Sequence, residues 1–121
     1  MDKIELARER RKQRRLEVLG TNNPICGTCG ENRWQCFEQH HVADYARDDT
    51  TVRECYNCHR ILSDNQRDHP SFNAAADPLL DRIGHFLLGL VDMLRLIVDK
   101  LHQFGMQLIE RAAIGMGEAQ A

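Results

Sequence analysis

The chain opens with a segment whose residues favour a helix. Residues 2–19 contain no Pro or Gly and are rich in Arg, Lys, Glu and Leu, which are strong helix formers. This composition predicts a helix that ends at Gly20, since glycine readily adopts the left-handed conformation common just after a helix. The turn-forming residues 21–24 then separate this helix from the middle of the chain.

A longer amphipathic helix is predicted near the C-terminus. Asp77-Pro78 is typical of a helix start, with Asp as the N-cap and Pro in the first helical position. The composition favours a helix from Leu79 to about Ile114, which Gly105 could split in two. Its wide apolar face contains Ile83, Leu87, Leu90, Leu94, Ile97, Leu101 and Leu108. Its polar stripe contains His85, Asp92, Arg95, Asp99, His102 or Gln103, and Glu110.

The length of this helix predicts a partner. At about 1.5 Å per residue, a single helix would be on the order of 50 Å long, more than a small domain can cover. The surplus apolar surface indicates contact with another chain, most simply a second copy in a homo-oligomer, with a membrane surface as the second possibility.

The middle of the chain alternates short strand-like and polar segments. Residues 34–41 and 50–54 have strand-like composition, joined by the polar stretch 43–49. Residues 56–66 favour a short helix, and Pro70 marks the break after it. The order of strand, loop, strand and helix predicts an α+β protein. The chain therefore divides into residues 1–20, a basic helix; residues 21–70, a central segment; and residues 71–121, a linker and amphipathic helical region.

Composition limits what the central segment can be. A chain of 121 residues has room for one domain with an appendage, which excludes two full enzyme domains. Aromatic residues make up only 6%, so there is little bulk for a core, and a metal or a partner chain is needed for stability. No signal peptide and no apolar run long enough to span a membrane is found, so a cytoplasmic location is expected.

Charge is divided unevenly along the chain. The formal charge is +3 over residues 1–20, −3 over residues 21–70 and −2 over residues 71–121. The cations of the first helix could follow the phosphates of a nucleic acid, although a solvated helix face is the alternative interpretation.

Five cysteines lie close together in the central segment. Cys26-Gly-Thr-Cys29 and Cys55-Tyr-Asn-Cys58 are two C-x2-C motifs, a spacing typical of structural zinc sites. Four thiolates complete a tetrahedral shell with no open position, so a structural Zn²⁺ is predicted. Cys36 is left over, and we interpret it as a small buried thiol on the first strand.

Three histidines lie near these motifs. His40 and His41 close the first strand-like run, and His59 follows Cys58 directly. Neighbouring side chains point to opposite faces of a regular strand, so the histidine pair could serve one centre only if the strand bends there.

Together these motifs resemble the HNH endonuclease family in its zinc-stabilised form. The resemblance covers about residues 25–69 and rests on four stretches: Cys26-x2-Cys29, Glu38-x-His40-His41-Val42-Ala43, Asp48-Asp49-Thr50-Thr51-Val52, and Cys55-x2-Cys58-His59-Arg60. It implies a ββα-metal fold that hydrolyses DNA phosphodiester bonds with a divalent cation. It further implies that His41 is the general base and that His40 and His59 bind the metal.

Two positions differ from the family pattern. Thr50 or Thr51 stands where the family has its middle Asn, and Ser63 stands four residues after His59, where a further ligand would lie. The shell would then need one of four aspartates, or water and phosphate; the aspartates are Asp44, Asp48, Asp49 and Asp64.

Hydrolysis of a phosphodiester bond is chemically reasonable at a site made of histidines and a divalent cation. An imidazole titrates near neutral pH and suits a general base, and a partly open metal site stabilises developing negative charge. Two imidazole ligands favour Mn²⁺, Ni²⁺, Co²⁺ or Zn²⁺ over Mg²⁺. The alternative is a non-catalytic zinc ribbon that binds nucleic acid or serves assembly, in which His40, His41 and His59 are ordinary polar or packing residues.

Overall fold

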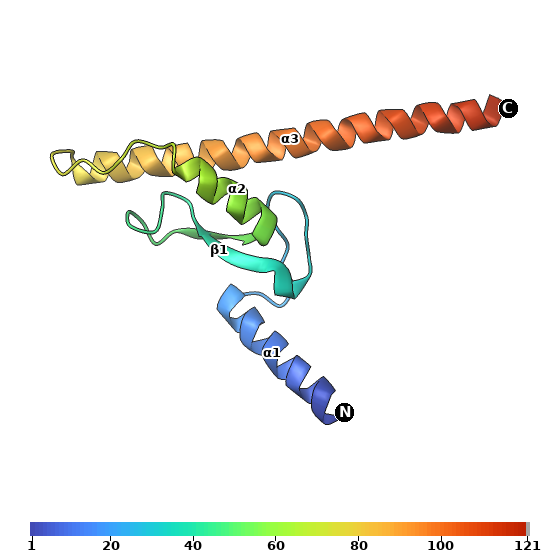
Figure 1. The fold of residues 1–121 in the computed structure, drawn as a ribbon, viewed down its shortest axis with the longest axis horizontal. Helices are drawn as coiled ribbons and strands as arrows, with labels where there is room; N and C mark the ends of the chain where they lie inside the picture. The colour runs from blue at the N-terminus through green and yellow to red at the C-terminus, as the bar shows by residue number, and fades with distance from the viewer. Residues whose placement is uncertain (121) are drawn as a thin grey trace.

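Three helices and a two-stranded antiparallel sheet make up the fold in the computed structural model (Figure 1). The structure describes residues 1–120, with side-chain surroundings for residues 1–115; Ala121, the last residue of the expected helical region, lies outside this range. The elements are α1 (Lys3–Leu19), the 3-10 helix η1 (Trp34–Cys36), β1 (Phe37–His41), β2 (Thr51–Cys55), α2 (Tyr56–Gln66) and α3 (Pro78–Gln120). The predicted α+β class is confirmed.

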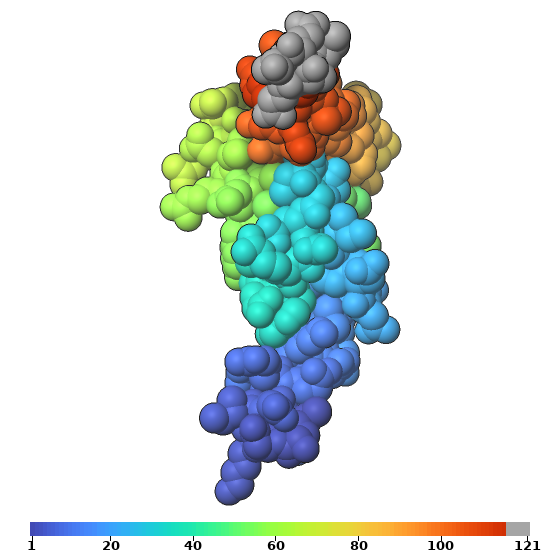
Figure 2. All heavy atoms as spheres, turned by 90° about the vertical axis from the view of Figure 1, so that its right-hand side faces the viewer, coloured from blue at the N-terminus to red at the C-terminus, as the bar shows by residue number. Residues whose placement is uncertain are grey.

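Helix α1 is attached to the rest of the molecule only near its C-terminal end. It begins at a capping box between Asp2 and Glu5 and ends at Gly20, which is left-handed with φ of 74°. Its buried residues, Leu16 and Leu19, lie in the last two turns, and the Arg15 guanidinium donates a hydrogen bond to the Phe37 carbonyl oxygen. The N-terminal turns project away from the fold (Figure 2).

The sheet is short because its second strand leads straight into a helix. Strands β1 and β2 pair in register from Phe37 opposite Cys55 to His41 opposite Thr51. The prediction of a strand over residues 34–36 was wrong, because these residues form a 3-10 turn. In it the Cys36 N–H donates a hydrogen bond of 2.9 Å to the Arg33 carbonyl oxygen. Helix α2 starts at Tyr56, so no strand lies opposite these residues. Cys36 therefore lies on η1, half-buried rather than buried on a strand.

The buried core cluster next to α2 is small and consists largely of cysteine, while Leu16, Val42, Ala43 and Leu62 are buried outside it. Its members are Leu19, Cys26, Phe37, Cys55 and Cys58, with Cys29 and Leu96 packed against them. Only two of the five buried members, Leu19 and Phe37, are large apolar side chains. Apolar burial alone is therefore limited, in line with the low aromatic content.

Helix α3 docks on the central segment through its polar and small residues. The residues turned toward the central segment are His85, Gly89, Asp92 and Leu96, spaced by four, three and four positions. Gly89 permits the close approach, because a Cβ atom there would lie 1.8 Å from the Val42 carbonyl oxygen. Helix α2 lies between the sheet and α3 (Figure 1).

Polar contacts stabilise the docking of α3 on the central segment. Both ring nitrogens of the buried His85 lie 2.9 Å from backbone carbonyl oxygens, those of Asp81 and Pro70. His69 Nε2 lies 2.6 Å from Asp92 Oδ2, and the Arg47 Nε–H donates to Asp81 Oδ2 over 3.1 Å. His85 and Asp92 of the predicted polar stripe thus lie on the docking face, whereas Arg95 and Asp99 of the same stripe are exposed. Most of the apolar face of α3 points outward.

Helix α3 continues unbroken beyond the central segment. The predicted start is confirmed, since the Asp77 carboxylate accepts hydrogen bonds from the Leu79 and Leu80 N–H groups, each 3.0 Å long. The proposed split at Gly105 does not occur, and the side chains of residues 101–115 are all exposed. Within the described part of the chain, no helix is long and apolar enough to cross a membrane.

The Gly89 contact can be tested directly. We expect Gly89→Ala to lower the free energy of unfolding by about 1–3 kcal/mol, because the new methyl group would overlap backbone atoms of Val42. Gly84→Ala and Gly105→Ala are matched controls with open space around the new Cβ, and helix propensity predicts stabilisation by up to about 1 kcal/mol. Chemical denaturation measures all three. Equal stability of Gly89→Ala and Gly84→Ala would contradict the close approach.

Candidate metal centre and histidine cluster

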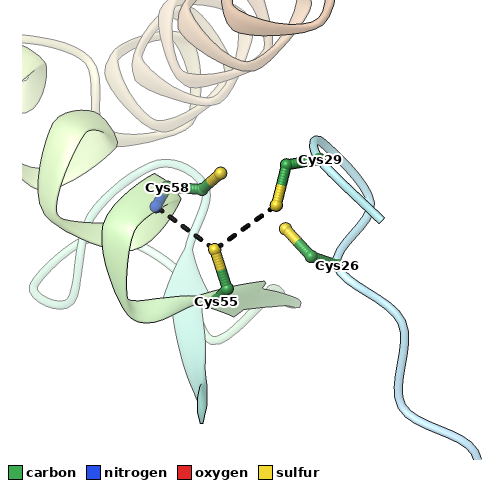
Figure 3. A group of neighbouring side chains, drawn as sticks. All are labelled: Cys26, Cys29, Cys55 and Cys58. Carbon is green, nitrogen blue, oxygen red and sulfur yellow. Dashed lines mark hydrogen bonds between the residues drawn. The ribbon is translucent and has the colours of Figure 1, made fainter. Parts of the chain in front are cut away.

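The two C-x2-C motifs come together at one point (Figure 3). Cys26 and Cys29 come from the loop before η1, Cys55 ends β2, and Cys58 lies in the first turn of α2. The four sulfur atoms all lie within 4.8 Å of one another. Tetrahedral ligands at about 2.3 Å from a zinc ion would be about 3.8 Å apart, so these side chains, the cysteine cluster, can hold a structural metal such as zinc.

The electrostatics of the cysteine cluster favour a cation. Burial raises the pKa of Cys26 to about 12, and burial together with the neighbouring thiols raises the pKa of Cys58 well above its ordinary value. Burial also opposes ionisation of Cys29, but the Glu31 N–H and the adjacent cysteines lower its pKa overall. Several buried thiols cannot ionise together without a positive charge, so the cluster suits a thiophilic ion that displaces their protons.

Hydrogen bonds fix the first motif in place. Cys26 N–H donates to Glu31 C=O over 2.9 Å, and Gly30, left-handed with φ of 79°, closes the turn. The carboxylate of the buried Glu54 accepts from Thr28 Oγ1 at 3.0 Å and lies 2.9 Å from Cys26 Sγ. Sequence reasoning missed Glu54, although it immediately precedes Cys55. It ties the Cys26 loop to β2.

A second group of polar side chains lies beside α2. His40 from β1 and His59 from α2 have ring centroids 5.4 Å apart, with the rings inclined by 69°. Glu38, two residues before His40 on the same face of the strand, accepts a hydrogen bond from His59 Nδ1. We call these three residues the histidine cluster. His59 is positioned by the cysteine cluster because it follows Cys58 directly.

His40 is buried and uncharged at neutral pH. Its side chain is only 1% exposed. Burial, followed by the positive charge of His59 and His41 when protonated, lowers the pKa of His40 to about 4. A neutral ring can offer a nitrogen lone pair to a metal ion.

His41 does not join the other two histidines. Strand β1 stays regular through His41, so the bend that would bring the pair to one centre is not formed before it. Its ring instead lies against Tyr45, with the ring centroids 5.1 Å apart, and its backbone carbonyl accepts from Gln66 Nε2 over 2.8 Å. The structure therefore brings His40 and His59 together and places His41 on the other face of the strand.

A pocket of about 710 Å³ opens at the histidine cluster. Its lining residues are Glu38, Tyr56, Asn57, His59, Arg60, Ser63, Asp64 and Arg67. Two of them, Arg60 and Arg67, are cations that sequence reasoning did not single out as site residues. A signal for them existed, because residues 56, 60, 63 and 67 recur at the spacing of one helix face.

The remaining expected ligands are divided between two places. Asp64 and Ser63 line the pocket with His59, as does Asn57. The other three aspartates, Asp44, Asp48 and Asp49, do not line it, and neither do Thr50 and Thr51. Asp44 pairs with Arg47, and Asp48 accepts from Thr50 Oγ1 over 3.2 Å, so these two serve the β1–β2 loop. Among the described residues, the cysteine cluster is the only group of three or more His, Cys, Asp or Glu side chains within reach of a single metal ion.

Comparison with known proteins identifies no relative: no protein family, curated protein or solved structure matches this chain significantly.

Removing one cysteine of the cluster should unfold the central segment. Structural zinc contributes on the order of 10–16 kcal/mol to such sites, comparable to or larger than the stability of a typical domain, about 5–15 kcal/mol. We therefore expect Cys29→Ser and Cys58→Ser to lose bound zinc, near-UV circular dichroism and the thermal transition. Cys36→Ser is the matched control, since Cys36 lies outside the cluster. A Cys58→Ser variant with an unchanged thermal midpoint would contradict the role of the cluster.

Proposed function

We propose that this chain is a metal-dependent endonuclease of the HNH type that hydrolyses DNA phosphodiester bonds. The observation that carries the proposal is the histidine cluster. His59, held beside the cysteine cluster, is paired with Glu38 and lies next to His40 at a pocket that also contains two arginines. The motif order that resembles the HNH family provides the reaction class.

His40 and His59 are the residues that would hold the catalytic cation. Since His59 Nδ1 donates to Glu38, Nε2 is the ring nitrogen left to bind, an arrangement common among metal-binding histidines. The two rings form only part of a shell, because Glu38, His40 and His59 do not gather within reach of one ion as the cysteines do. A divalent cation bound there would stabilise the negative charge that develops on the phosphate.

The other residues have roles that follow from their positions. Arg60 and Arg67 line the pocket and offer planar guanidinium groups that match phosphate oxygens. The resemblance assigns the general base to His41, which lies at the end of β1 on the opposite face and outside the pocket lining, so it could take a proton only from a water molecule bound at the end of the strand. Because His41 and His40 lie on opposite faces of β1, the ring nitrogens of His41 are not needed to bind the cation. They stay available to accept a proton.

The charge distribution supports α1 as the part of the chain that would capture DNA. The central segment is net acidic, and four metal-bound thiolates would add roughly two further negative charges. Helix α1 projects from the fold and carries seven cations: Lys3, Arg8, Arg10, Arg11, Lys12, Arg14 and Arg15. All but Arg15 are free of contacts to the central segment among the hydrogen bonds and ion pairs of the described residues. They can therefore neutralise phosphates.

A non-catalytic zinc ribbon is the second candidate function. It is favoured by the burial of His40 and by the presence of only one complete ligand group among the described residues. The two candidates differ in metal content. A ribbon binds one tightly held ion per chain, whereas a nuclease binds a second, exchangeable ion at the histidine cluster.

Cleavage of plasmid DNA across a series of Mn²⁺, Ni²⁺, Co²⁺, Zn²⁺ and Mg²⁺ tests the proposal. We expect His41→Ala to lower the cleavage rate by about 100-fold or more, the usual contribution of a general base, while divalent-ion binding is retained. His59→Ala should weaken both cleavage and binding of the second ion. His102→Ala, on the exposed part of α3, is the control and should cleave like wild type. A chain that is inert toward DNA and RNA with every ion would refute the nuclease proposal.

Glu38 provides an independent test of the histidine cluster. Loss of a carboxylate that orients a metal-binding histidine typically costs 10- to 100-fold in affinity or activity, on the order of the effect we expect for Glu38→Ala. Calorimetric titration with Mn²⁺ measures the affinity apart from catalysis. Glu110→Ala, an exposed carboxylate on α3, is the control. Unchanged Mn²⁺ affinity in Glu38→Ala would remove Glu38 from the proposed site.

A further inference from the structure

An unbroken heptad repeat of apolar residues runs along α3. Nine apolar residues follow one another at alternating intervals of three and four: Leu80, Ile83, Leu87, Leu90, Leu94, Ile97, Leu101, Phe104 and Leu108. This is the a and d pattern by which helices pack against one another in coiled coils. We call these nine residues the heptad seam.

The heptad seam lies on the side of α3 opposite the central segment. The docking residues His85, Gly89, Asp92 and Leu96 occupy the f and c positions of the same heptads, and f lies opposite the a and d edge. The seam residues at the a positions are accordingly 55–67% exposed: Leu80, Leu87, Leu94, Leu101 and Leu108. At the d positions Ile83 and Phe104 are exposed, while Leu90 and Ile97 are half-buried, so intramolecular packing leaves most of the seam open.

Residues 101–115 of α3, whose side-chain surroundings the structure describes, are not covered by the rest of the chain. The side chains of residues 101–115 are all exposed, and α3 extends well past the rest of the fold (Figure 1). In proteins, most of the stability of a helix comes from the packing of its amphipathic face against a neighbour. A partner packed along the seam would supply that neighbour.

We infer that the seam binds a second copy of this chain. In coiled coils, charged residues at the e and g positions beside the seam select the partner and repel unsuitable ones. Here those positions are almost uncharged from Gly84 to Gln107, with Lys100 as the one exception. No row of like charges beside the seam would therefore repel an identical helix. The apolar residues of one copy can pack against the same residues of a second copy.

The charges of α3 fit a protein partner better than a lipid surface. Over residues 78–115 the helix carries four basic and four acidic residues: Arg82, Arg95, Lys100 and Arg111 against Asp81, Asp92, Asp99 and Glu110. These charges cancel, so an anionic membrane gains little electrostatic attraction. The apolar residues Val91 and Val98 at e and Phe86 and Met93 at g widen the seam, which leaves room for more than two copies.

Light scattering of the full-length chain with its metal bound tests this assembly. Wild type should have a mass that is a multiple of 14.0 kDa, and the double variant Leu94→Glu/Leu101→Glu should have a mass of 14.0 kDa. Ile109→Glu is the matched control: Ile109 is 66% exposed, like the seam leucines, but lies outside the seam. It should keep the wild-type mass. Retention of the tightly bound zinc ion of the cysteine cluster verifies that each variant is folded.

Three outcomes would overturn the inference. They are a monomeric wild-type chain, equal dissociation by Ile109→Glu, or a monomer that co-sediments with phosphatidylserine vesicles and loses this binding in the double variant. The last would assign the seam to a membrane surface. None of them bears on nuclease activity, so the two proposals fail separately.

Discussion

The convergence of four cysteine side chains is the constraint on which the rest of the structure depends. It joins the loop before η1 to the junction of β2 and α2, two parts of the chain that are otherwise linked by the contacts of the buried Glu54 with Thr28 and Cys26. Only Leu19 and Phe37 are large among the buried members of the core cluster around the cysteines, so apolar burial at this point is limited. The orientation of His59 follows from the same constraint, since it is attached to Cys58.

Local rules allowed much of the fold to be predicted from the sequence. The limits of α1 follow from Asp2 and Gly20, and the start of α3 follows from Asp77 and Pro78, because helix ends depend on a few neighbouring residues. The cysteine cluster was equally predictable, since C-x2-C spacing places two thiolates on one ion. In each case the residues that allow the prediction lie within a few positions of the helix end or metal ligand that they predict.

Features that depend on contacts between distant segments could not be predicted in this way. Residues 34–36 have strand-like composition, but α2 begins where their pairing partner would have to continue. The sequence did not determine that His40 faces α2 while His41 faces Tyr45, because that depends on how far β1 stays regular. Nor did the periodicity of α3 reveal which face docks. The usual expectation of an apolar face inward fails here because Gly89 lets the backbones approach and His85 and Asp92 find polar partners.

The contact between Gly89 and Val42 also fixes a distance. A helix that slid by one residue along the central segment would bring Leu88 or Leu90 against the Val42 carbonyl, where there is no room for a side chain. Val42 follows His41 directly, so the separation between the histidines and the outer edge of α3 is set by backbone geometry rather than by a flexible tether. In any assembly built on that edge, the distance from one histidine cluster to the next would therefore be constant.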